Sequence, residues 1–171
     1  SSVEVMQQIS SVVKSLLNAE RPVLWLGHGI RLSGAQDQIE SLLNRLNIPA
    51  LVSWAGIDMV DSGHPMVFGR AGVYGQRSAN FILQNSDYVL AIGTRLAIPQ
   101  VGYDLSELAR AAIIDIVDID PQEANKHSAR TRLGIACDAA FFIQTLMERL
   151  KLEEISKKEE WIAQCKRYQE Q

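Results

Sequence analysis

Five short clusters of small and polar residues stand directly after apolar runs in this sequence, and they are the positions where binding chemistry is most easily placed. Glycine lets a backbone approach a ligand closely, and the N–H groups of a helix that starts after such a turn can bind phosphate. An aspartate can accept hydrogen bonds from ribose hydroxyls, and an arginine can pair with a diphosphate. The clusters are Gly27-His28-Gly29, Ser53-Trp54-Ala55-Gly56, Gly93-Thr94-Arg95, Asp118-Ile119-Asp120 and Cys137-Asp138.

These clusters predict a ligand-binding edge rather than a catalytic set. In an open parallel sheet, ligands bind outside the carboxyl ends of the strands. The sequence has no nucleophile elbow, Walker loop or HExxH motif, so it assigns no catalytic or metal-ligating residue. The candidate nucleotide-binding residues are Gly27, Gly29, Gly93, Arg95 and Asp118.

Several of these candidates also have a purely structural interpretation, which the sequence leaves open. The first cluster is not a G-x-G-x-x-G fingerprint, because Leu32 stands at the third glycine position. Asp120 precedes a proline and is a better helix cap than a ribose ligand. Asp118 is the better ribose candidate. Arg95 pairs either with a diphosphate or with Asp118 or Asp138. Cys137 has no indicated base nearby and is interpreted as a small buried residue rather than a nucleophile.

The spacing of apolar residues predicts strands that alternate with helices. Solid apolar runs predict buried strands near Val23, Leu51, Leu90, Ile114 and Gly134. Helices are expected over residues 5–17, 33–46, 78–83, 105–109 and 140–150, with Ser33 and Asp120 as caps and residues 54–75 irregular. This alternation predicts an α/β fold, a three-layer parallel sheet with helices on both faces.

Composition limits the classes of function. The length of 171 residues fits one domain, and the net charge of −3 gives no basic footprint for nucleic acid and no cationic surface for a membrane. No apolar run approaches the roughly 20 residues that span a bilayer, and the first residues do not resemble a signal peptide. Two widely separated cysteines indicate a reduced, cytoplasmic setting.

Six segments of the sequence occur in an order that has a counterpart in a known family. They are RPVLWLGHG at 21–29, IPALVS at 48–53, GRAGVYGQRSAN at 69–80, SDYVLAIGTRL at 86–96, VDIDP at 117–121 and CD at 137–138. In this order they resemble the middle domain of thiamine-diphosphate-dependent enzymes of the acetolactate synthase-like family. The resemblance runs from about Arg21 to Leu150.

The resemblance implies a Rossmann-like sheet of about six strands between two other domains. Residues 1–150 would be the middle domain, and the charge-rich residues 151–171 a linker helix outside the core, leading to a C-terminal diphosphate-binding domain. Thiamine diphosphate and Mg²⁺ would bind in the pyrimidine-binding and diphosphate-binding domains of the same chain, so this portion alone would be inactive. The parent enzyme would act on a 2-oxo acid as a homodimer or homotetramer.

The resemblance leaves the nucleotide open. Middle domains of acetolactate synthase and pyruvate oxidase relatives bind FAD, those of oxalyl-CoA decarboxylase relatives hold ADP, and several others bind nothing. FAD-binding synthases carry acidic residues and a second arginine after the position of Arg95, whereas this sequence continues LAIPQVGY at 96–103. This departure weakens the case for FAD and favours a related decarboxylase or carboligase. A nucleotide would lie across the five candidate residues, with its diphosphate near the glycines.

Two other classes of function stay open at this point. Three segments, at residues 27–34, 84–87 and 93–94, faintly resemble signatures of a stand-alone NAD-dependent deacylase of the sirtuin kind. That class needs a zinc-binding cysteine quartet, and this sequence has two cysteines. The third class is a flavin-carrying electron-transfer domain, which a yellow colour after purification would support.

Overall fold

The computed structural model describes residues 2–53, 64–72, 75–94, 109–126, 128 and 130–171. Strands and helices alternate along most of this part of the chain, as the apolar spacing predicts. The elements are α1 (Ser2–Asn18), β1 (Pro22–Leu26), α2 (His28–Leu32), α3 (Gln36–Leu46), β2 (Ala50–Val52), β3 (Val67–Arg70), α4 (Arg77–Asn85), β4 (Tyr88–Ile92), β5 (Ile113–Asp118), α7 (Pro121–Asn125), β6 (Leu133–Ala136), α8 (Ala139–Leu150) and α9 (Glu159–Gln169).

Six parallel strands form one sheet in the order β3-β2-β1-β4-β5-β6. This confirms the predicted parallel α/β fold, and all five predicted strands are present. From β1 the chain adds β2 and β3 on one side of that strand, and then returns to add β4, β5 and β6 on the other. The strand order therefore reverses between β1 and β4, which is where open sheets of this kind bind ligands.

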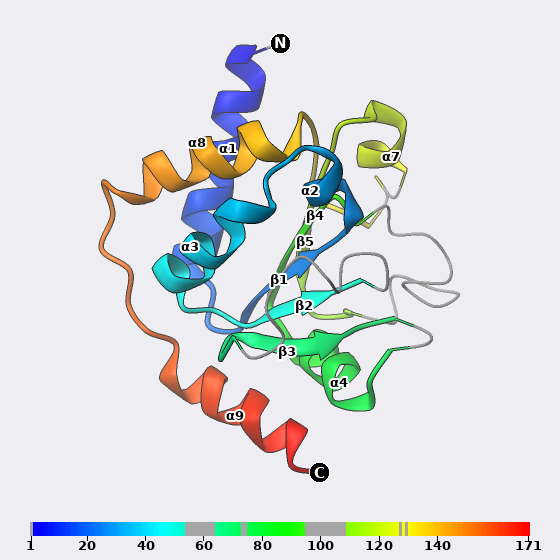
Figure 1. Cartoon of the computed structure of the whole chain (residues 1–171), viewed down its shortest axis with the longest axis vertical. Helices are drawn as coiled ribbons and strands as arrows, with labels where there is room; N and C mark the ends of the chain where they lie inside the picture. The colour runs from blue at the N-terminus through cyan, green and yellow to red at the C-terminus, as the bar shows by residue number, and fades with distance from the viewer. Residues whose placement is uncertain (1, 54–63, 73–74, 95–108, 127, 129) are drawn as a thin grey trace.

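Helices cover both faces of the sheet (Figure 1). On one face α1, α2, α3 and α8 pack on a cluster that includes Leu24 and Leu26 of β1. On the other face α4 and α9 pack on a cluster that includes Val23 and Trp25 of the same strand. Successive residues of a strand point to opposite faces, so a strand buried on both faces must be apolar throughout. This explains why β1 reads as a solid apolar run.

Two elements depart from the sequence expectation. Strand β3 lies within the stretch expected to be irregular. The short helix α2 was not expected, and Ser33 ends it instead of capping the next helix: its hydroxyl donates to the carbonyl of Ile30 at 2.8 Å. Helix α3 begins after Ala35, which provides no side-chain cap. The expected helix at 105–109 lies, apart from its last residue, outside the described residues.

Helix α9 corrects the expectation that the C-terminal tail stays outside the core. Trp161 is 3% exposed and Cys165 is fully buried, and both belong to the cluster beneath α4. The indole N–H of Trp161 donates to the carbonyl of Pro22 at 2.9 Å, and the Lys158 ammonium donates to that of Leu17 at 3.1 Å. The sequence prediction was wrong because two buried residues one helical turn apart are enough to anchor a charged helix. That the tail leads to another domain stays a prediction.

Replacing Trp161 by alanine is expected to lower the free energy of unfolding by roughly 3–5 kcal/mol, the usual range for a buried tryptophan, because it leaves a cavity under α4. Leu152→Ala is the matched control in the same tail, since that side chain is 86% exposed and its loss should change stability by less than about 0.5 kcal/mol. Chemical denaturation measures both. Equal effects would show that α9 does not pack on the sheet.

Candidate functional site

A pocket of about 90 Å³ lies at the carboxyl ends of the strands, beside the point where the strand order reverses. It brings together three of the five candidates, namely Gly29, Gly93 and Asp118. Residues that follow β1, β4, β5 and β6 all contribute to it, so the predicted gathering at one edge of the sheet is present. Its lining residues are Gly29, Leu32, Ser33, Gly93, Val117, Asp118, Ile119, Asp138 and Ala139.

The glycines of this edge allow two loops to touch. The N–H groups of Gly27, Gly29 and Gly93 donate to the carbonyls of Ile92, Gly93 and Val117, each at 2.9 Å. A Cβ added at Gly29 would lie 2.8 Å from the Cα of Gly93. The glycines are therefore needed for backbone contact, and their N–H groups are not free to bind phosphate. This removes the donors on which the expectation of a diphosphate near the glycines relied.

Asp118 is the polar centre of the pocket. Its side chain is 6% exposed, and its Oδ1 accepts a hydrogen bond from the backbone N–H of Asp120 at 2.9 Å. No donor among the described residues reaches its Oδ2. A buried carboxylate that lines a pocket is suited to accept hydrogen bonds from a hydroxylated ligand.

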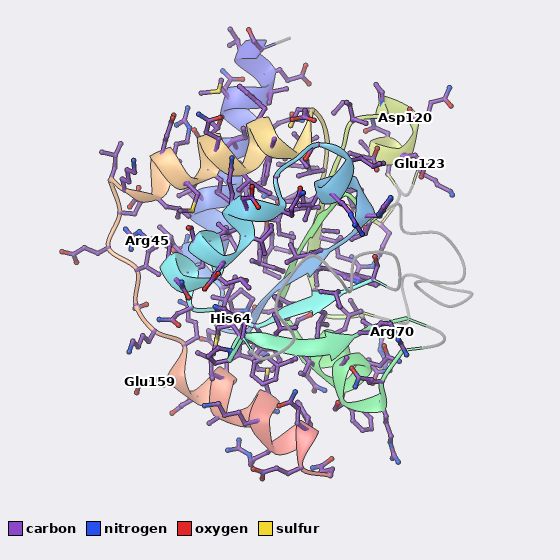
Figure 2. All side chains as sticks on the ribbon, viewed as in Figure 1. Arg45, His64, Arg70, Asp120, Glu123 and Glu159 are labelled. Carbon is purple, nitrogen blue, oxygen red and sulfur yellow. The ribbon has the colours of Figure 1, made fainter. Side chains whose placement is uncertain are left out.

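Asp120 is a helix cap, as the sequence favoured. Its Oδ1 accepts from the N–H of Gln122 at 2.9 Å, and Pro121 occupies the first turn of α7. Figure 2 shows Asp120 and Glu123 at this helix, on the side of the sheet where the strands end. The side chain of Asp120 does not line the pocket.

Asp138 brings a second carboxylate to the pocket and also caps α8. Its Oδ2 accepts from the N–H of Phe141 at 3.2 Å. The neighbouring thiol of Cys137 is disfavoured as a thiolate, because burial and the charge of Asp138 raise its pKa to about 11. This agrees with the interpretation of Cys137 as a structural residue, since the thiolate is the nucleophilic form.

Two apolar side chains flank the carboxylates. Leu32 at the end of α2 is 72% exposed, and Ile119 after β5 is 69% exposed. Both line the pocket together with Asp118. Exposed apolar residues beside a carboxylate suit a ligand with a flat apolar part and a hydroxylated part, and a nucleoside has both.

Three further polar groups near the same edge lack hydrogen-bond partners in the described part of the chain. They are the hydroxyls of Ser53 and Thr94, whose residues are 0% and 1% exposed, and Nδ1 of His28. Ser53 adjoins the end of β1, because its N–H donates to the carbonyl of Leu26 at 2.9 Å. Thr94 follows β4 and packs against Gly27, since a Cβ added at Gly27 would overlap the Cα of Thr94. Buried polar groups are seldom left without partners, so these are candidate ligand contacts.

Two arginines, Arg95 and Arg70, follow or end strands at this edge of the sheet in the sequence. The candidate Arg95 lies outside the described residues. Arg70 ends β3 at the carboxyl side of the sheet (Figure 2). The loop after it is held by Asn80, whose amide donates to and accepts from the backbone of Gly72, at 2.9 Å in each case. The asparagine of the GRAGVYGQRSAN segment thus has a structural role.

A buried ion pair at the opposite edge of the sheet escaped the sequence analysis. Asp115 is fully buried and accepts from Tyr88 at 2.6 Å and from Arg132 at 2.5 and 3.1 Å. Burial, followed by the charge of Asp115, raises the pKa of Tyr88 well above its ordinary value. The hydrogen bond to Asp115 raises the pKa of Arg132. Tyr88 begins β4, so this group lies away from the pocket and links strands rather than binding a ligand.

No three histidine, cysteine, aspartate or glutamate side chains among the described residues are grouped as a metal site would require. None of the helices in this part of the chain has the length and apolar character needed to cross a membrane.

Comparison with known proteins finds one matching protein family and several similar sequences. The family described as thiamine pyrophosphate enzyme, central domain, matches residues 9–146. The chain is 32% identical over 144 residues to the probable acetolactate synthase large subunit of Methanococcus aeolicus, which covers 84% of this chain and 24% of that protein.

Other relatives give the same result. The chain is 32% identical over 155 residues to the probable acetolactate synthase large subunit of Methanocaldococcus jannaschii, covering 91% of this chain and 26% of that protein. The chain is 27% identical over 146 residues to the acetolactate synthase isozyme 3 large subunit of Escherichia coli (strain K12), covering 85% of this chain and 25% of that protein. The chain therefore spans about a quarter of the length of these curated relatives.

Proposed function

The chain belongs to the family of thiamine pyrophosphate enzyme central domains, and from this premise we propose that it is the non-catalytic middle domain of an acetolactate synthase-like carboligase or decarboxylase. In this role it positions the catalytic domains and binds an adenine nucleotide, ADP or FAD. The observation that carries the nucleotide proposal is the pocket around Asp118, beside the reversal of strand order.

The pocket fits one part of a nucleotide. Its volume of about 90 Å³ is below the roughly 300–1,000 Å³ of pockets that enclose a whole ligand. Oδ2 of Asp118, which no donor among the described residues reaches, supports placing the ribose there, since a carboxylate accepts hydrogen bonds from ribose hydroxyls in related sheets. The base then lies against Leu32 and Ile119, which line the same pocket.

The phosphates belong elsewhere on the same edge. Two carboxylates line the pocket and repel phosphate, while the N–H groups of the glycines are already bonded. The buried hydroxyls of Ser53 and Thr94, which lack partners among the described residues, support a phosphate position over the ends of β2 and β4. Arg95 follows Thr94 directly in the sequence and stays an expected phosphate partner.

The wider assembly follows from the family. We propose that a parent chain contributes pyrimidine-binding and diphosphate-binding domains, which hold thiamine diphosphate and Mg²⁺ and act on a 2-oxo acid. A homodimer or homotetramer in the cytoplasm is the proposed form. Two observations support this proposal. The chain covers only about a quarter of the length of its relatives, and those relatives are named as acetolactate synthase large subunits. No observation in the described residues favours the deacylase or the electron-transfer domain.

Isothermal titration calorimetry tests the nucleotide proposal. ADP or FAD is expected to bind, and Asp118→Asn is expected to weaken binding by at least about tenfold, because a hydrogen bond to a charged group is worth roughly 1.5–3 kcal/mol. Asn keeps the Oδ1 acceptor for the N–H of Asp120. The control is Asp120→Asn, which also caps a helix well and lies outside the pocket. Absence of heat with both nucleotides at millimolar concentration would rule out the proposal.

A turnover assay tests the non-catalytic role. The 171-residue chain, supplied with pyruvate, thiamine diphosphate and Mg²⁺, is expected to release no CO₂ and form no acetolactate above a no-protein control. The reason is that the proposed catalytic groups lie in the other two domains. Turnover above the control would show that this portion of the chain is itself an enzyme.

A further inference from the structure

We propose that the pocket selects nucleotides whose ribose has free 2′- and 3′-hydroxyls and rejects those that carry a phosphate on the ribose. This inference rests on the proposed function, because it takes the ribose of a bound nucleotide to lie beside Asp118. It adds a specificity and assigns that specificity to a second residue, Asp138.

The charges that line the pocket are of one sign. Among the described residues, Asp118 and Asp138 are its only charged side chains, and no lysine or arginine lines it. A ribose hydroxyl donates a hydrogen bond to a carboxylate, whereas a phosphate dianion has no proton to donate and is repelled. Asp118 is 6% exposed, so water screens its charge poorly and the repulsion is strong.

Helix α8 does not reverse this preference. The N-terminus of a helix ordinarily attracts anions. Here Asp138 already occupies that position, with its Oδ2 accepting from the N–H of Phe141 at 3.2 Å. The same hydrogen bond fixes the carboxylate at the pocket. No donor among the described residues reaches Oδ1 of Asp138, so none of them offsets the charge that this carboxylate brings to the pocket.

Space acts in the same direction as charge. The pocket measures about 90 Å³ and is lined in part by Gly29 and Gly93, whose backbones are in close contact. A ribose with a phosphate attached needs considerably more room than a ribose alone. Rejection of the phosphorylated ribose thus has two independent causes.

Calorimetry on the 171-residue chain with three matched probes tests this specificity. They are adenosine 5′-monophosphate, adenosine 2′,5′-bisphosphate and adenosine 3′,5′-bisphosphate, which differ only in the ribose phosphate. Both bisphosphates are expected to bind at least about tenfold more weakly than the monophosphate, as like-charge contact predicts. Asp138→Asn keeps the helix cap and is expected to reduce this difference by about threefold or more, because it removes one of the two like charges.

The outcomes separate this inference from the proposed function. If ADP and the monophosphate bind and either bisphosphate binds as tightly, the specificity is refuted and the nucleotide site stands. If Asp138→Asn leaves the ratio of affinities unchanged while circular dichroism shows an intact fold, Asp138 is not the selecting residue. If neither ADP nor the monophosphate binds, both proposals fail together.

Discussion

Gly27→Ala is expected to lower the free energy of unfolding by about 3 kcal/mol, because the added methyl group has nowhere to go. A Cβ at this position would overlap the carbonyl oxygen of Gly93 and the Cα of Thr94. Both obstacles are backbone atoms, so no side chain can rotate away. The φ of Gly27 is −127°, which any residue adopts, so the loss comes from steric overlap alone. The overlap lies at the carboxyl edge, so nucleotide affinity should fall as well.

Gly34→Ala is the matched control seven residues along the same segment. Gly34 has a φ of +79°, and nothing lies within 4 Å of an added Cβ. Its replacement should cost about 1 kcal/mol from backbone strain, without any overlap. Denaturant titration of both variants measures the difference. A Gly27→Ala variant no less stable than Gly34→Ala would mean that the loops after β1 and β4 are not in contact.

Arg132→Met is expected to lower the free energy of unfolding by about 3 kcal/mol. The variant leaves Asp115 fully buried without the cation that donates to it at 2.5 and 3.1 Å. Breaking a buried ion pair usually costs roughly 3–5 kcal/mol. The lower end applies because the Arg132 side chain is 34% exposed and solvent screens part of the interaction.

The double variant Arg132→Met/Asp115→Asn shows whether the cost comes from the stranded charge. Removing both charges should restore about half or more of the loss, since replacing both partners of a buried pair is far less costly than removing one. Asn retains an acceptor for the Tyr88 hydroxyl, which lies 2.6 Å from Asp115. A double variant as unstable as the sum of two single losses would contradict this explanation.

Most of the sheet could be predicted from sequence because its strands are buried on both faces. The run from Val23 to Leu26 needs no tertiary information to be recognised as a strand. Strand β3 could not be found this way: it is four residues long, only partly buried, and contains Gly69 at a φ of +111°. Helix α2 is equally hidden, because it spans five residues and includes Gly29, a poor helix former.

The meeting of the candidate residues at one edge of the sheet was predictable, but their hydrogen bonding was not. Residues that end neighbouring parallel strands must meet at one edge, so Gly29, Gly93 and Asp118 were brought together correctly. The bonded state of the glycine N–H groups, however, depends on how two loops pack. The lack of partners for the hydroxyls of Ser53 and Thr94 depends on the whole surroundings of each side chain, which no local pattern encodes.

A crystal structure of the chain with bound ADP tests the central claim most directly. The account predicts that the ribose hydroxyls lie within hydrogen-bonding distance of Oδ2 of Asp118, in the pocket beside Gly29 and Gly93. It also predicts that the phosphates extend away from Asp138, towards Ser53 and Thr94. ADP bound at any other surface, or with its phosphates against the two aspartates, would contradict the account.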